Sequence, residues 1–435
     1  MEKIKKLKQK IKKAKIDGYL IPKNDEFFNE YLPFYNDRLN FISNFTGSYG
    51  FSIILKNKNF LFVDGRYTLQ ATKQSGSFFK IVTIPNLMPS EVLKRKKYLI
   101  GYDPKLITSK TLNNFFNKSK FDLKPIRYNL IDEIWKRKFK IKTKKFYTLP
   151  NNSIGEGYKS KINKVVAFLK KKKADFQFIS SSENNAWLFN IRGGDSRYSP
   201  IPNCFTLIDK DKNIKIFCEL KKISHQFKRK FKKVEFFEIE FIEKIFSDIY
   251  KKKFIIDRNT CSVYFEDIIL KKNKILNLDD PIYNFKSIKN KKEIKNIKLA
   301  HLYDGSALTK YLFWLKKNFI SKKLTEISAS KKLFEFRKKN KSFKFSSFPT
   351  ISGTGPNGAI IHYKATKKSN RLLKKGDIYL VDSGGQYEFG TTDVTRTISL
   401  NNNDRRVKNI FTRVLKGHIA VANYKLKEKS SGSKI

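Results

Sequence analysis

An internal repeat constrains the fold of this chain more strongly than any other feature of its sequence. Residues 51–63 align without gaps on residues 205–217, and each copy reads as two apolar β-strands around a turn rich in lysine and asparagine. Each copy also follows a lysine-rich helical segment and an apolar strand that starts at Asp17 or at Asp175. Two copies of one α/β unit predict two similar domains in tandem.

The first copy shows the expected order of elements most clearly. Apolar residues recur at helical spacing over residues 2–15, which predicts a helix with one buried stripe. A buried strand is expected over residues 17–22, and a hairpin is expected from residues 51–55 and 59–63. The turn at residues 64–67 then leads into a further helix.

The length of 435 residues suggests about three domains. Polar residues and a proline interrupt the pattern near residues 147–150, and a second break lies near residues 287–292. The sequence therefore predicts domains over residues 1–147, 148–287 and 288–435. In the third domain a helical stripe covers residues 294–315, and Thr325 is the expected N-cap of a helix that runs to about Arg337.

Two aspartates in the third domain are the first candidates for chemistry. Residues 379–400 read as two short strands with glycines between them, and folding this segment about its midpoint sets Asp382 opposite Asp393. Directly opposed residues of an antiparallel pair have Cβ atoms about 4.5–5.5 Å apart. That separation suits carboxylates that share two cations about 3.5–4 Å apart. The alternative is a structural role, because an aspartate beside glycines often caps a turn.

A histidine precedes this aspartate hairpin in the chain. His362 follows a glycine-rich loop that starts at Gly353, and we expect a short apolar strand between the loop and the histidine. A lone histidine on an apolar strand is often a core residue with satisfied hydrogen bonds. His362 alone therefore does not indicate a site, and its role depends on the glycine-rich loop and the two aspartates near it in the chain.

The combination of the loop at residues 353–363 and the hairpin sequence Val381-Asp-Ser-Gly-Gly-Gln-Tyr387 resembles the catalytic domain of cytosolic Xaa-Pro aminopeptidases. The Asn190-Ile-Arg-Gly193 segment of the second repeat copy is also similar to that family. The resemblance implies a fold of class α/β and α+β. Two tandem creatinase-N-terminal-like α/β domains would precede an incomplete catalytic domain of the "pita-bread" metallopeptidase type.

The resemblance also implies roles for individual residues. Asp382 and Asp393 would bind two divalent metal ions, most often Mn²⁺ in this family, and Asp393 would bridge them. His362 would be a catalytic and substrate-binding residue that stabilises the transition state. Arg66 would contact substrate, and a surface arginine at a helix start is the alternative. Arg396 is expected to order the hairpin by pairing with a carboxylate.

The implied reaction is removal of the first residue from peptides with proline at position two, by attack of a metal-activated hydroxide. A homodimer is implied for the complete enzyme, together with a cytoplasmic location. The family needs a further ligand histidine, another active-site histidine and two glutamates, which lie beyond the part of the domain that this chain matches. We therefore expect the 435 residues alone to be inactive.

The composition leaves a noncatalytic alternative open. Lysine and arginine total 93 against 39 acidic residues, a net charge of +54, which is typical of proteins that bind nucleic acid or anionic surfaces. The lysines are scattered through every segment, however, so we expect no specific nucleic-acid partner. A binding scaffold that uses RNA remains the alternative function, and a dipeptidase or creatinase of the same fold is the alternative enzyme.

Two further features bear on the cellular environment. The three cysteines, Cys204, Cys218 and Cys261, form neither a close pair nor a dense scaffold, which indicates a reducing compartment. No run of about 18 apolar residues is present, so we expect neither a transmembrane helix nor a membrane partner.

Overall fold

The computed structural model describes residues 2–94, 97–116, 121–137, 143–150, 152–401, 404–426 and 431–432. The chain divides into two compact units. The first unit comprises residues 1–299 and 388–390, and the second comprises residues 300–387 and 391–435.

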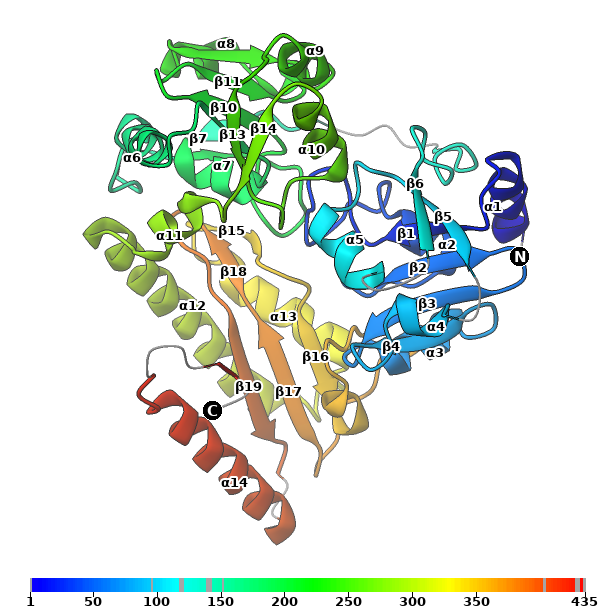
Figure 1. Cartoon of the computed structure of the whole chain (residues 1–435). Helices are drawn as coiled ribbons and strands as arrows, with labels where there is room; N and C mark the ends of the chain where they lie inside the picture. The colour runs from blue at the N-terminus through cyan, green and yellow to red at the C-terminus, as the bar shows by residue number, and fades with distance from the viewer. Residues whose placement is uncertain are drawn as a thin grey trace. The chain divides into compact units, whose positions relative to one another are not determined.

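The first part of the first unit is built on a six-stranded mixed sheet (Figure 1). The strand order is β4-β3-β2-β1-β5-β6, with the hairpin β2–β3 antiparallel and the outer strands parallel to their neighbours. The strands are β1 (Gly18–Pro22), β2 (Phe51–Leu55), β3 (Asn59–Asp64), β4 (Lys80–Ile84), β5 (Tyr98–Tyr102) and β6 (Phe121–Pro125). The helices are α1 (Glu2–Lys13), α2 (Arg38–Ser43), α3 (Thr68–Ser75), α4 (Pro89–Val92) and α5 (Ser109–Phe116).

A second six-stranded sheet repeats this topology, in the order β12-β11-β10-β8-β13-β14. Its strands are β8 (Phe176–Ile179), β10 (Phe205–Asp209), β11 (Ile214–Phe217), β12 (Val234–Phe237), β13 (Lys253–Ile256) and β14 (Lys274–Asn277). Short strands β7 (Tyr147–Thr148) and β9 (Ile191–Arg192) pair beside it. The helical segments are α6 (Tyr158–Lys171), α7 (Ser182–Leu188), η1 (Leu220–Lys222), α8 (His225–Lys230), α9 (Phe241–Ser247), α10 (Val263–Leu270) and α11 (Pro281–Ser287). The predicted tandem repeat is confirmed.

The gapless alignment of the two repeat hairpins is wrong by one residue in the second strand. In the first hairpin Phe51 pairs with Phe62, whereas in the second Phe205 pairs with Phe217. The second turn therefore contains one additional residue. Because turn length sets the register of a hairpin, and one residue of slip moves each side chain to the other face, the alignment must carry a gap at this turn.

Each sheet is covered by apolar side chains on both faces. The stripe predicted for residues 2–15 is confirmed, because Ile4, Leu7 and Ile11 of α1 are buried in the core on one face of the first sheet. Phe51 and Phe62 stack with their ring centroids 4.7 Å apart in the core on the other face. The second sheet has a corresponding pair of cores.

The two repeated domains contact each other directly through backbone hydrogen bonds. Val263 N donates to Ile107 O at 2.9 Å, and Tyr264 N donates to Pro104 O at 3.0 Å. An aromatic stack between Phe27 and a phenylalanine of β10 adds apolar contact, with ring centroids 4.9 Å apart. These contacts join the tandem copies into one compact unit.

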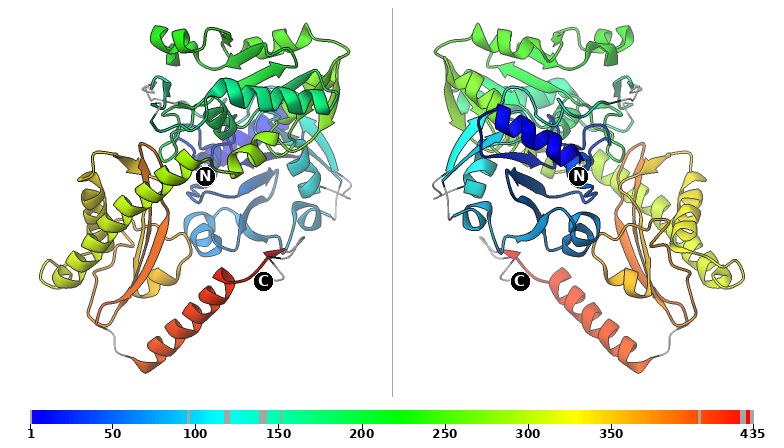
Figure 2. Two further views of the ribbon diagram at one scale, coloured as in Figure 1. Left: turned by 90° about the vertical axis from the view of Figure 1, so that its left-hand side faces the viewer. Right: turned by 90° about the vertical axis from the view of Figure 1, so that its right-hand side faces the viewer.

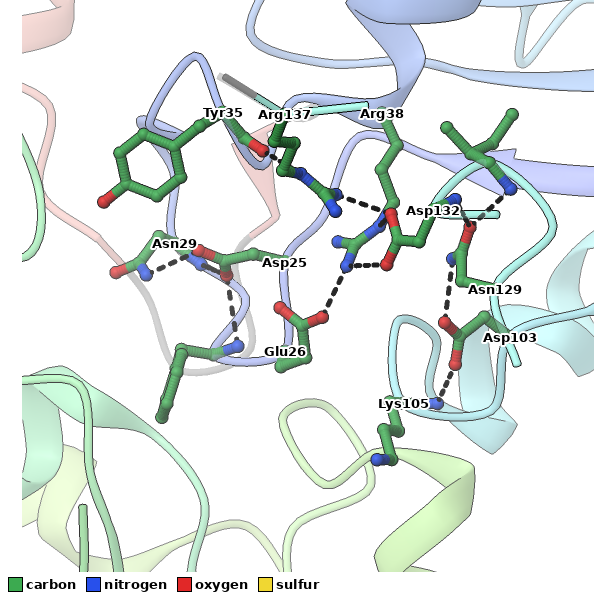
Figure 3. Close-up of polar contacts among 12 residues, drawn as sticks. Asp25, Glu26, Asn29, Tyr35, Arg38, Asp103, Lys105, Asn129, Asp132 and Arg137 are labelled. Carbon is green, nitrogen blue, oxygen red and sulfur yellow. Dashed lines mark hydrogen bonds and ion pairs between the residues drawn. The ribbon is translucent and has the colours of Figure 1, made fainter. Parts of the chain in front are cut away.

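Arg38, at the start of α2, is the centre of an ion network in the first domain (Figure 3). Its Nε and Nη2 atoms donate to the two carboxylate oxygens of Asp132 at 2.8 Å, and Nη2 also donates to Glu26 Oε1 at 2.7 Å. Burial opposes ionisation of Asp132, but hydrogen bonds and charges of Arg38 and Arg137 outweigh burial and lower its pKa. The network fixes the loop between β1 and α2.

The second unit contains two small antiparallel sheets, β16-β17-β19 and β15-β18. The strands are β15 (Phe343–Ser346), β16 (Ile351–Thr354), β17 (Ile378–Ser383), β18 (Gly385–Tyr387) and β19 (Val394–Ser399). The helical segments are α12 (Lys291–Asn318), which begins in the first unit, α13 (Glu326–Lys338), the 3-10 segment η2 (Gly355–Ala359) and α14 (Arg405–Ala422). Thr325 caps α13 as predicted.

Helices α12 and α13 lie on one face of β16 and β17 (Figures 1 and 2). Their contact is apolar: Tyr311 of α12, Leu333 of α13 and Val381 of β17 belong to one buried cluster. No residue of α14 is buried. Within the described ranges, no helix combines the length and the apolar character that a bilayer crossing requires.

Candidate active site

The aspartate hairpin forms, with a register different from the predicted one. Asp382 on β17 pairs with Thr395 on β19, and the same register continues where Thr392 N donates to Gly385 O at 2.9 Å. Asp393 therefore lies beside Gly384 and diagonally across from Asp382. The predicted direct opposition of the two aspartates is wrong by two residues. A slip of two residues keeps a side chain on the same face, so the two carboxylates still share one face of the hairpin.

The segment that joins β17 to β19 is held by further hydrogen bonds across the hairpin. Gly385 N, at the start of β18, donates to Thr392 Oγ1 at 2.9 Å. A Cβ at Gly384 would lie 2.0 Å from Thr392 O and 2.2 Å from Ser347 Oγ. Only glycine fits where these backbones approach each other, so Gly384 allows the close approach of the segment that carries Asp393.

The electrostatics of Asp382 suit a cation. Its Oδ1 atom is buried and has no hydrogen-bond partner among the described residues. Burial raises the pKa of Asp382, and the neighbouring Asp393 charge raises it further, while a hydrogen bond from Thr395 and the proximity of His362 act in the opposite direction. An unsatisfied carboxylate oxygen beside a second carboxylate is a costly arrangement without a positive charge. Hard divalent cations favour carboxylate oxygens, so these residues fit such an ion.

His362 belongs to the same cluster, because it interacts electrostatically with Asp382. The short apolar strand expected before it is absent: the loop forms η2, and residues 360–362 form a bend and a turn. His362 is exposed and has a φ angle of +55°, in the left-handed region. The expectation of an apolar strand is wrong, because the residues before His362 form η2 and a bend and do not adopt extended backbone with a paired neighbour.

A buried ion pair supports the strand that carries Asp382. Arg337 donates from Nε to Asp304 Oδ1 at 2.7 Å and from Nη2 to Asp304 Oδ2 at 2.9 Å. Arg337 Nη2 also donates to Ser383 Oγ at 3.1 Å, and Tyr387 OH donates to Asp304 Oδ1 at 2.8 Å. No local pattern predicted this contact, because the partners lie 33 to 83 residues apart in the chain.

The two arginines named from the sequence make local contacts in their own units. Arg66 follows β3 in the first unit, and its Nε and Nη2 atoms bind the Asp64 carboxylate, with a shortest distance of 2.6 Å. Arg396 donates to the backbone oxygen of Thr395 at 2.8 Å. Among the described residues no ion pair of Arg396 is found, so its pairing with a carboxylate stays a prediction.

Comparisons with known proteins bear on this site. Family models of the creatinase/prolidase N-terminal domain match residues 3–129 and 137–293, and the model of metallopeptidase family M24 matches residues 295–435. A probable Xaa-Pro aminopeptidase P of Paracoccidioides lutzii is 34% identical over 447 residues, which cover 95% of this chain and 71% of that protein. The chain belongs to the Xaa-Pro aminopeptidase P family. The relative from Laccaria bicolor is 33% identical and is covered to 68% of its length.

A solved structure agrees with this assignment. The X-prolyl aminopeptidase of Caenorhabditis elegans, described as a cytosolic enzyme with a di-nuclear active site, matches all of this chain and 75% of its own chain. The TM-score is 0.92 at 27% identity. The predicted order of two creatinase-N-like domains and an M24 pita-bread domain is therefore confirmed. The aminopeptidase P fold places the aspartate hairpin in the metallopeptidase domain.

Proposed function

We propose that this protein releases the first residue from peptides whose second residue is proline, with two divalent cations held in part by Asp382 and Asp393. Membership of a metallopeptidase family supports the reaction type. The observation that carries the proposal is the Oδ1 atom of Asp382, which is buried without a hydrogen-bond partner among the described residues, on the face that Asp382 shares with Asp393. Asp393, diagonal to it, would contact both cations.

The proposed cations are manganese ions, and the di-nuclear site of the nematode enzyme supports the number two. When bound, they would supply a nucleophile near neutral pH by lowering the pKa of a coordinated water. Asp382 and Asp393 would hold the positive charge in place. The hydrogen bond from Thr395 to Asp382 would orient that carboxylate and leave Oδ1 available.

His362 would act on the substrate. Its side chain is exposed beside Asp382, so an imidazole N–H can donate to the peptide oxygen on which negative charge develops. Arg66 would bind the substrate through Nη1, which its pairing with Asp64 leaves unused. Both assignments rest on the match of these residues to the family's motifs.

The proposal also covers the domain boundaries and the ligands that the two aspartates need beside them. Domains over residues 1–147, 148–287 and 288–435 are kept as proposed boundaries. The resemblance assigns further ligands, a histidine and two glutamates, to a later part of the family's catalytic domain. We therefore propose that these 435 residues alone do not turn over substrate. A cytoplasmic location and a homodimer of the complete enzyme complete the proposal.

Hydrolysis of the peptide Arg-Pro-Pro with manganese tests this function. We would compare the chain with a fusion that continues it with the part of the Paracoccidioides lutzii relative beyond the aligned region. The fusion should release arginine, and D382N or D393N should abolish the release. E335Q is the matched control, because Glu335 is an exposed acid on α13 that pairs with Lys332 and, among the described residues, with no other side chain. Release by the 435-residue chain would contradict its proposed inactivity, and equal release by D382N would contradict the site.

The noncatalytic alternative has its own signature. A scaffold that uses its charge of +54 on RNA would bind RNA stoichiometrically and lose that binding steeply with salt. It would take up no manganese. Filter binding of RNA at two salt concentrations, beside a manganese titration, distinguishes the two functions.

A further inference from the structure

Glu326, the first residue of α13, is a buried carboxylate that organises the loop around His362. It is fully buried and accepts hydrogen bonds from donors on three separate segments. Thr354 N, at the end of β16, donates to Oε1 at 2.9 Å, and Arg371 N donates to Oε2 at 3.0 Å. Asn357 Nδ2, in η2, donates to both oxygens at 3.0 and 3.2 Å.

The residue after His362 completes this arrangement. Tyr363 OH donates to Glu326 Oε2 at 2.8 Å and itself accepts from Asn357 Nδ2 at 2.8 Å. Burial and the adjacent carboxylate raise the pKa of Tyr363 to about 12, so the hydroxyl keeps its proton at neutral pH. The position of Glu326 in the first turn of α13 also favours a negative charge there.

His362 itself is held in a conformation that needs such support. Its φ angle of +55° is unfavourable for a residue other than glycine and persists where the surroundings impose it. The side chain is exposed and is not packed in a core. Its neighbours on both sides are anchored instead: Asn357 and Tyr363 bind Glu326, and Tyr363 N donates to Ile360 O at 3.1 Å.

We propose that Glu326 and Tyr363 are positioning residues that hold the turn of His362 against the Asp382–Asp393 carboxylates. The inference deepens the proposed function and rests on it. Neither residue touches the reacting atoms in this account. They act through His362, by restricting its turn to the conformation in which the imidazole faces the metal-binding carboxylates.

Manganese broadening of histidine NMR signals tests the position of His362 directly. The chain has four histidines, so selective ¹³C labelling of the imidazole rings gives a small set of signals. Paramagnetic Mn²⁺ broadens nearby signals far more than distant ones. In the unaltered chain the His362 signal should broaden selectively at substoichiometric manganese, and D382N/D393N should remove this selective broadening.

The variants Y363F and E326Q then test the inference. Each variant weakens a buried hydrogen bond to the Glu326 side chain. The population of molecules in which the turn of His362 has left its position should rise about tenfold, so the selective broadening of the His362 signal should weaken. Manganese binding, measured by electron paramagnetic resonance, should stay unchanged. Y311F is the matched control, because it removes a buried tyrosine hydroxyl that pairs with Tyr379 and does not contact the turn.

The outcomes separate the two proposals. Absence of selective broadening in the unaltered chain would overturn the metal site, and with it the inference. Selective broadening that Y363F leaves unchanged would overturn the inference and leave the metal site standing. Y363F deletes one oxygen atom, so it keeps the test decisive even where E326Q fails to fold.

Discussion

Removal of Arg337 should destabilise the second unit strongly, because it breaks a buried ion pair. Arg337 and Asp304 have side chains that are 1% and 2% exposed, and Arg337 also holds Ser383, the neighbour of Asp382. In R337M the Asp304 carboxylate would keep, of its side-chain partners among the described residues, the hydroxyl of Tyr387. Breaking a buried pair in this way costs about 3–5 kcal/mol.

Hydrogen exchange followed by mass spectrometry measures this cost locally. Peptides from β17 and β18 should exchange about 100- to 4,000-fold faster in R337M, the factor that corresponds to that free energy. Peptides from β1 in the first unit provide the internal reference. The double variant R337M/D304L should recover much of the loss, because it removes both charges. Unchanged exchange in R337M, or a double variant as unstable as the single one, would refute the reasoning.

Three other substitutions test separate contacts. R38M should lower the free energy of unfolding by about 2–3 kcal/mol at pH 7. The difference from the unaltered chain should shrink below a pH of about 4 in thermal denaturation, because Asp132, whose pKa is lowered in the folded state, then becomes protonated. Burial lowers the pKa of Lys161 to about 8. Between a pH of about 8 and 10.5 the unfolded chain therefore binds a proton that the folded chain lacks. Denaturation should show the free energy of unfolding of the unaltered chain, relative to that of K161M, rising by ~3 kcal/mol over this range. G384A should lower the melting temperature and weaken manganese binding, since a Cβ would lie 2.0 Å from a backbone oxygen across the hairpin.

Much of the fold could be predicted from local sequence, and register could not. The repeat of residues 51–63 revealed the tandem domains, because strand patterns and turn residues are local signals. The same alignment missed the additional turn residue of the second hairpin. In the catalytic domain the predicted midpoint of the hairpin was misplaced by one position, which shifts the pairing by two residues, because hydrogen bonds such as the one between Gly385 and Thr392 select the register and local composition does not encode them.

The candidate site divides in the same way. Asp382, Asp393 and His362 could be named from short motifs, and the structure brings them together. The groups that hold them could not be named. Glu326 binds residues 28 to 45 positions away, and a buried acid at a helix start resembles an ordinary surface residue in sequence. Long-range hydrogen bonds of this kind become visible only in three dimensions.

Manganese binding by the 435-residue chain tests the central claim most directly. Electron paramagnetic resonance of a manganese titration should show bound metal in the unaltered chain and in E335Q, and only free metal in D382N/D393N. Equal binding in D382N/D393N, or no bound manganese in the unaltered chain, would contradict the account.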